Sequence, residues 1–287
     1  MNLRDYLKSI KPAIVGSIMV FIGIFLSRKG ISIEIFTASV MFGPIAYLFL
    51  ALSGIIIIKI LQIIENPSSD NRFSIKQAKI IFGVTYLIGL MLAIISIIIS
   101  STIYHLNIFI LVFAVSFGIL WALLGYYAFK IKINSDLIKS IIRCLVFSLG
   151  ILYGALLITR LIPLFVYFFF LTASFLQLSR ELIKDLPKRD QAEREVIFKR
   201  GDDIYNSLKS SLVLQFLAIT FFILPIFTNI AFPLLYLFFM VVDLIIIGLA
   251  SVLILKSISE RKMFNIIGLL LKIGILIELI TFIVIGS

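Results

Sequence analysis

The stretch FTASVMFGPIAYLFLALSGIIII, residues 36–58, contains 23 consecutive positions without a charged side chain. Because an α-helix rises about 1.5 Å per residue, this run is long enough to cross the ~30 Å apolar core of a bilayer. Its apolar residues do not alternate with polar ones, as they do in the strands of an outer-membrane barrel. The run therefore predicts a membrane-spanning helix.

The composition extends this prediction to the whole chain. Of its 287 residues, 61% are hydrophobic and 14% are charged, and the mean hydropathy is +1.17. Soluble domains are about half apolar and a quarter charged, so a water-soluble protein is excluded. We expect an all-α, polytopic membrane protein with a single transmembrane domain over residues 1–287.

Eight further apolar runs accompany the first, which predicts nine transmembrane helices. The runs lie at 12–27, 36–58, 78–99, 104–129, 139–159, 161–183, 209–229, 231–255 and 263–285.

The basic residues are distributed very unevenly over this map. The amino-terminal stretch and the connections after runs two, four, six and eight hold 23 of the 26 Lys and Arg, with Lys272 counted among them. Only Arg28, Lys29 and Arg160 fall on the other side. Cytoplasmic loops are enriched in Lys and Arg, so we predict a cell-membrane protein with a cytoplasmic amino terminus and an outer carboxyl terminus. The net charge of +11 then reflects loop bias, and no nucleic-acid partner is expected.

The sixth run continues into the charged sequence RELIKD, residues 180–185. Pro187 disfavours helix at the residue before it, so the helix should end near Asp185. Glu181 and Asp185 are four residues apart and share a helix face. Two carboxylates at a helix carboxyl end face the negative pole of the helix dipole, at a cost of about 0.3–1 kcal/mol each. A cation is therefore expected beside them.

Two interpretations of that cation are open. In the first, neighbouring basic side chains form a solvated charge network, namely Lys184, Lys188, Arg189 and Arg194. In the second, a divalent metal ion is held by Glu181, Asp185 and Asp190, while basic residues hold the oxygens of a phosphate-bearing ligand.

Three charged residues lie inside the predicted spans, Asp243, Lys272 and Glu278. An ionised group at bilayer depth costs several kcal/mol and usually has a partner or lines a cavity. Asp243 and Lys272 are predicted either to form a structural ion pair between neighbouring helices or to line an interior cavity. Glu278 points to a different side of its helix from Lys272, and we expect it to extend toward the outer face.

Several segments together resemble the UbiA family of intramembrane prenyltransferases, most of all its archaeal digeranylgeranylglyceryl phosphate synthases. IKPAIVG near the amino terminus resembles the Leu-Arg-Pro opening of the family, and RELIKD matches the start of its second aspartate motif. SIKQA, VVDLIII and LLLKIGILIELITFIVIGS resemble the entry to its third span and its last two helices. The nine spans, with charged connections after the second and sixth, fit the same family.

The resemblance implies a UbiA-like helical bundle and a transferase of lipid biosynthesis. Such an enzyme uses Mg²⁺ to bind a prenyl diphosphate and passes the isoprenoid chain to a lipid or aromatic acceptor. The catalytic residues it implies are Asp185 and Asp190, and the metal ligands are Glu181, Asp185, Asp190 and Glu193. The substrate-binding residues it implies are Lys59, Arg72, Arg180, Lys184, Asp243 and Lys272.

The chain departs from the family at the first aspartate motif. Alignment on Ser53 and Gly54 places Ile58, Lys59, Gln62 and Asn66 where the family has Asn and three Asp, and residues 35–64 contain no Asp or Glu. The local charge changes from about −3 to +1. Such a site can hold a phosphate or diphosphate directly, by Lys59 and Arg72, without the metal ion.

Three functions follow from these observations. The first is a divergent prenyltransferase. The second is a catalytically lapsed paralogue that binds a polyprenyl lipid or a membrane partner. A small transporter is the third and is disfavoured, because there is no evident internal repeat and no pair of Gly- or Pro-broken spans.

Overall fold

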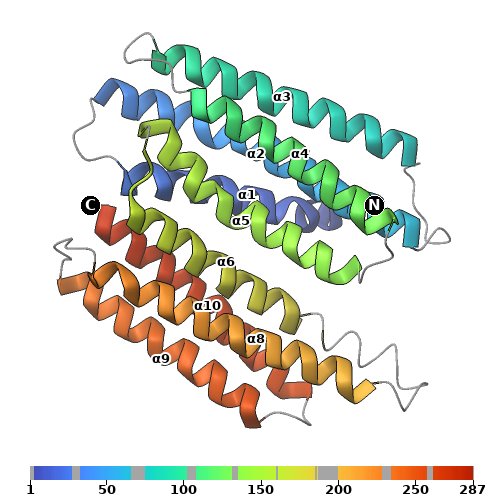
Figure 1. The fold of residues 1–287 in the computed structure, drawn as a ribbon, viewed down its shortest axis with the longest axis vertical. Coiled ribbons are helices and arrows are strands. Elements are labelled where there is room, and N and C mark those ends of the chain that lie inside the picture. The colour runs from blue at the N-terminus through green and yellow to red at the C-terminus, as the bar shows by residue number, and fades with distance from the viewer. Residues whose placement is uncertain are drawn as a thin grey trace. The chain divides into compact units, whose positions relative to one another are not determined.

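The computed structural model describes residues 3–27, 33–65, 75–101, 108–130, 135–159, 161–184, 186, 200–227, 234–256 and 261–286. Within these residues the chain forms nine α-helices and one short 3-10 helix (Figure 1). The helices are α1 (Leu3–Leu26), α2 (Ile33–Glu65), α3 (Ile75–Ser101), α4 (Ile108–Lys130), α5 (Ser135–Ile158), α6 (Leu164–Lys184), α8 (Arg200–Ile223), η1 (Leu224–Phe227), α9 (Leu234–Lys256) and α10 (Arg261–Gly286). Each predicted run overlaps one α-helix, and the run at 209–229 also covers η1.

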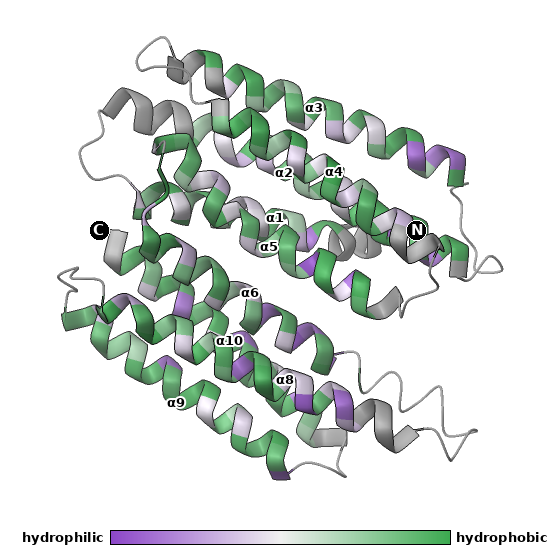
Figure 2. Ribbon diagram, in the orientation of Figure 1, coloured by the Kyte–Doolittle hydropathy of each residue, from purple (hydrophilic) through white to green (hydrophobic). Residues whose placement is uncertain are grey.

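The helices have the length and composition of membrane spans. Among the described residues, eight helices are long and apolar enough to cross a bilayer, and α1 carries a shorter apolar stretch, Ile10–Leu26. Figure 2 shows that most of each helix is apolar and that hydrophilic residues gather at the start of α3 and the end of α6. The predicted all-α membrane fold is confirmed, and the chain is an integral membrane protein.

The helices pack into two compact units, Met1–Val166 and Tyr167–Ser287, which we call unit 1 and unit 2. Within each unit, consecutive helices run in alternating directions (Figure 1). One end of unit 1 therefore holds the end of α2 together with the starts of α3 and α5. One end of unit 2 likewise holds the end of α6 and the start of α8.

In unit 1, α1 and α5 approach each other through glycine. A Cβ on Gly16 would collide with the carbonyl oxygen of Val146, and a Cβ on Gly150 would collide with the carbonyl oxygen of Gly16. Gly23 and Gly154 meet the opposite backbone in the same way. Small residues let membrane helices pack backbone against backbone, where dispersion forces are strongest.

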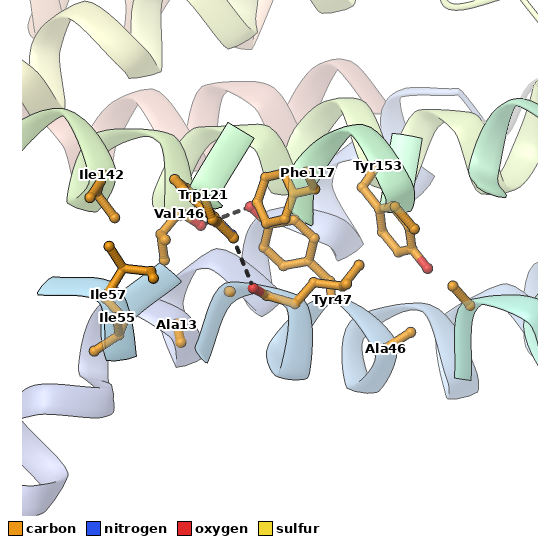
Figure 3. Close-up of a cluster of buried hydrophobic side chains, with 14 of the residues drawn as sticks. Ala13, Ala46, Tyr47, Ile55, Ile57, Phe117, Trp121, Ile142, Val146 and Tyr153 are labelled. Carbon is orange, nitrogen blue, oxygen red and sulfur yellow. Dashed lines mark hydrogen bonds between the residues drawn. The ribbon is translucent and has the colours of Figure 1, made fainter. Parts of the chain in front are cut away.

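Aromatic side chains fill the space between α2, α4 and α5 in unit 1 (Figure 3). The Tyr47 hydroxyl donates a hydrogen bond to the carbonyl oxygen of Val146 at 2.8 Å. Trp121 Nε1 donates to the carbonyl oxygen of Leu50 at 3.3 Å, and the ring of Trp121 packs edge-on against Phe117 at 4.6 Å between centroids. Both polar atoms are thereby satisfied in an apolar interior, as buried aromatic groups require.

In unit 2, polar side chains on three helices are connected by hydrogen bonds. The hydroxyls of Ser179 on α6 and Ser211 on α8 are 2.7 Å apart. Gln215 Nε2 donates to both hydroxyls, at 3.1 and 3.2 Å, and Ser251 on α9 donates to Gln215 Oε1 at 2.7 Å. We call Ser179, Ser211, Gln215 and Ser251 the serine–glutamine ladder, which fastens α6, α8 and α9 together.

Candidate functional site

Three cations lie near the end of unit 1 where α2 ends and α5 begins, and each of them also interacts within the protein. Lys139 is only 6% exposed, and Lys59 and Arg143 are half-buried. Lys139 and Arg143 are four residues apart on α5 and therefore share a face. We call Lys59, Lys139 and Arg143 the basic cluster.

The packing of α2 against α5 places these cations at one level of unit 1. A Cβ on Gly54 would lie 3.1 Å from Val146 Cγ2, and Ile57 faces Ile142 across the helices (Figure 3). Lys59 lies two residues beyond Ile57, about 200° further around α2, and Lys139 and Arg143 flank Ile142 in the sequence of α5. With a rise of about 1.5 Å per residue, the basic cluster spans about 6 Å along the helix axes.

Sequence reasoning identified only one member of this cluster. Lys59 was predicted from its place in the first aspartate motif, whereas Lys139 and Arg143 were counted only as loop charge. The available signal was their spacing of four residues at the start of an apolar run, which puts both on one face of α5. At the other motif positions, Ile58 is buried at 4% exposure and Gln62 is exposed.

At the end of α6 in unit 2, Glu181 is surrounded by donors. Its side chain is 3% exposed, and it accepts hydrogen bonds from Gln177 Nε2 at 3.2 Å and Lys184 Nζ at 3.3 Å. Arg180 Nη1 lies 3.7 Å from Glu181 Oε1. Lys184 also lies in the last turn of α6, where a cation offsets the negative pole of the helix dipole. This carboxylate is therefore compensated by protein cations.

Among the described residues, no group of three or more His, Cys, Asp and Glu side chains could hold a metal ion. Glu181 does not fit a magnesium ligand as it stands, because a metal ion would have to displace Arg180 and Lys184. Asp185, Asp190, Glu193 and Arg72 lie outside the described residues, so their predicted roles stay predictions.

The predicted ion pair between Asp243 and Lys272 is wrong. Both Asp243 carboxyl oxygens are buried without a hydrogen-bond partner in the described part of the chain, and Lys272 is exposed. Asp243 on α9 instead faces Gly274, since a Cβ on Gly274 would lie 3.1 Å from Asp243 Oδ1. Positions 272 and 274 of a helix are about 200° apart, which places Lys272 on the far side of α10. Substrate binding by Asp243 or Lys272 stays a prediction.

The expectation for Glu278 is also wrong. Its side chain does not extend toward the outer face but is 0% exposed, and neither carboxyl oxygen has a hydrogen-bond partner in the described part of the chain. Glu278 lies four residues after Gly274 and thus on the same face of α10. Burial of that face against α9 places the Glu278 carboxyl in the interior of unit 2.

Two solved membrane proteins have a fold similar to that of this chain. One is a digeranylgeranylglyceryl phosphate synthase, with a TM-score of 0.71 at 23% identity, covering 99% of this chain and 98% of that protein. The other is a UbiA homologue from Aeropyrum pernix K1, with a TM-score of 0.57 at 15% identity and 96% coverage of both chains. No protein-family model and no curated protein matches the chain. The likenesses confirm the predicted UbiA-like fold.

Proposed function

We propose that this chain is a divergent intramembrane prenyltransferase, which transfers an isoprenoid chain from a prenyl diphosphate to a lipid or aromatic acceptor. The fold supports this proposal, because it follows a digeranylgeranylglyceryl phosphate synthase over nearly the whole length of both chains. The observation that carries the proposal is the basic cluster at the predicted cytoplasmic end of unit 1, which suits a diphosphate group.

The basic cluster supplies positive charge where the UbiA family is expected to supply aspartates. Lys139, at 6% exposure, is shielded from solvent, so its charge acts through a medium of lower effective dielectric than water. Lys59 and Arg143 extend the same positive region. A hydrogen bond to a charged group contributes about 1.5–3 kcal/mol, so each of these cations that bonds to the diphosphate would strengthen binding by about that amount.

The chemistry follows from the charge that develops during transfer. The bond between C1 of the prenyl chain and the bridging oxygen of diphosphate breaks, and the oxygen keeps the electron pair. Positive groups held in place near that oxygen lower the barrier, because they stabilise the charge as it develops. The nucleophilic atom of the acceptor then bonds to C1 and releases its proton to solvent.

The candidate ligands for Mg²⁺ in this proposal all lie outside the described ranges. Bound Mg²⁺ would neutralise diphosphate oxygens, with Asp185, Asp190 and Glu193 as its candidate ligands. Glu181, the one described residue of the predicted ligand set, is not counted among them, because it already pairs with Arg180 and Lys184.

A lapsed paralogue that binds a polyprenyl lipid or a membrane partner is the second candidate. The engagement of Glu181 by two cations and the replacement of the first aspartate motif by Lys59 favour it. The prenyltransferase forms a prenylated product from what it binds, whereas the lapsed paralogue binds without forming a product.

The test is product formation by purified protein with radiolabelled prenyl diphosphates, Mg²⁺ and a panel of lipid and aromatic acceptors. We expect a labelled prenylated product from the natural chain and a loss of at least tenfold in Asp185→Ala. The matched control is Lys209→Gln, which removes an exposed charge from α8 and should leave the rate unchanged. Absence of product across the panel, with prenyl diphosphate still bound, would establish the lapsed paralogue instead.

A further inference from the structure

Unit 2 contains two buried carboxyl groups that the proposed function does not use. Asp243 on α9 and Glu278 on α10 are both 0% exposed. All four of their carboxyl oxygens lack a hydrogen-bond partner within the described residues. Most buried polar groups in proteins have such a partner, so these two carboxyl groups require an explanation.

The two carboxyl groups lie close together. Gly274 of α10 faces Asp243, with 3.1 Å between its Cβ position and Asp243 Oδ1. Glu278 follows one turn later on the same face of α10. Both groups therefore lie in the contact between α9 and α10, and we call them the carboxyl pair.

The surroundings of the pair are apolar. The Cβ position of Gly274 lies 3.5 Å from Ile247 Cγ1 and 3.8 Å from Leu176 Cδ2. Tyr236, the nearest titratable side chain along the buried face of α9, donates its hydroxyl to the carbonyl oxygen of Phe222 at 3.4 Å. The other described charged side chains of unit 2 lie at the end of α6 or on exposed surface, namely Arg180, Glu181, Lys184, Lys209, Lys256 and Lys272. None of them bonds to either carboxyl group.

Two ionised carboxylates cannot persist in this setting. Each would cost several kcal/mol at bilayer depth without a partner, and their mutual repulsion would add to that cost. A hard metal ion needs about six oxygen ligands, whereas the described neighbours supply only these two carboxyl groups. The oxygens are also buried so completely that no space for a water-sized ion adjoins them. A proton needs neither ligands nor space.

We propose that Asp243 and Glu278 form a proton-binding site in the interior of unit 2, in which the two carboxyl groups hold at least one proton between them. The protonated group donates its O–H to an oxygen of the other carboxyl group, which satisfies atoms that otherwise lack a partner. This hydrogen bond fastens α9 to α10. Loss of the proton would leave two like charges buried in the same apolar interior, and their repulsion would weaken the packing of α9 against α10. The proposal does not depend on prenyl transfer.

The test is infrared spectroscopy of the purified full chain at neutral pH, where the C=O stretch of a carboxylic acid is separate from the bands of carboxylates. We expect an acid band equivalent to at least one protonated carboxyl group per chain. The double variant Asp243→Asn, Glu278→Gln should lose this band. Glu181→Gln is the matched control, since Glu181 is equally buried but compensated by cations, and it should leave the band unchanged.

Three results would overturn the proposal. One is the absence of an acid band in the natural chain, which can be seen even if the double variant does not fold. Another is an acid band of full intensity in the folded double variant, because the proton would then reside elsewhere. The third is a metal ion that copurifies in equal amount with the natural chain and is absent from the double variant.

Discussion

Substitution of a glycine in the contact between α1 and α5 should destabilise the protein, whereas the same change in open space should not. At Gly150, an alanine Cβ would collide with the carbonyl oxygen of Gly16 and lie 3.0 Å from Met19 Cβ. The Gly16 oxygen belongs to the helix backbone, and Met19 Cβ is attached directly to it. Neither atom can therefore move aside by a side-chain rotation. The two helices must separate instead.

The loss in the free energy of unfolding can be estimated from the packing contact between α1 and α5 that is lost. A gap of about 0.5–1 Å forfeits a quarter to a half of the dispersion energy between facing atoms. After local relaxation, overpacking of this kind costs about 1–3 kcal/mol. Gly83 on α3 has no atom within 4 Å of its Cβ position, so Gly83→Ala should gain up to about 1 kcal/mol from helix propensity. We therefore expect the two substitutions to differ in sign.

The assay is reversible unfolding of Gly150→Ala and Gly83→Ala in mixed detergent micelles, with the free energy of unfolding obtained at equilibrium. Both variants lie in unit 1 and add the same methyl group, so each controls for the other. An equal or greater stability of Gly150→Ala than of Gly83→Ala would refute the close approach of α1 and α5.

The remaining predictions concern the basic cluster and the serine–glutamine ladder. Lys139→Gln should weaken binding of a prenyl diphosphate about 10- to 100-fold, because it removes a charged hydrogen-bond donor worth about 1.5–3 kcal/mol. Lys256→Gln, which removes an exposed charge from α9, should leave the affinity unchanged in the same titration. Ser211→Ala should lower the free energy of unfolding by about 0.6–1.7 kcal/mol, as hydrogen bonds between membrane helices typically contribute. Thr220→Ala, whose exposed hydroxyl bonds to the carbonyl oxygen of Phe216 within its own helix, should change it by less than about 0.5 kcal/mol.

The number and position of the helices were predictable because the bilayer imposes a length and a composition on each span. The run at 36–58 falls inside α2, although α2 extends to Glu65 and so carries Lys59 within the helix. The polar residues that follow an apolar run gave no sign of that extension. Sequence hydropathy identifies the part of a helix inside the bilayer better than the point where the helix ends.

The partners of buried charges were not predictable in the same way. Asp243 and Lys272 have opposite charge and lie in neighbouring spans, which favours a pair by sequence alone. The structure instead brings Asp243 to Gly274 and leaves Lys272 exposed. The rotation of each helix about its own axis decides this outcome, and it is set by packing of the whole unit.

The basic cluster shows what a motif-based reading misses. Lys59 was found because it occupies a position where the family is expected to have an aspartate. Lys139 and Arg143 lie some 80 residues further along the chain, and the packing of α2 against α5 brings them to the same level of unit 1 as Lys59. The sequence alone predicts that Lys139 and Arg143 share a face of α5. It does not predict which helix packs against α5 at that level.

In the proposed function, the basic cluster can hold the diphosphate of an isoprenoid substrate without a metal ion. The most direct test of this claim is equilibrium binding of a labelled prenyl diphosphate to the purified protein in the presence of excess chelator. We predict that the natural chain still binds and that the variant Lys139→Gln, Arg143→Gln loses at least tenfold in affinity. Abolition of binding by the chelator, or equal affinity in the variant, would contradict the claim.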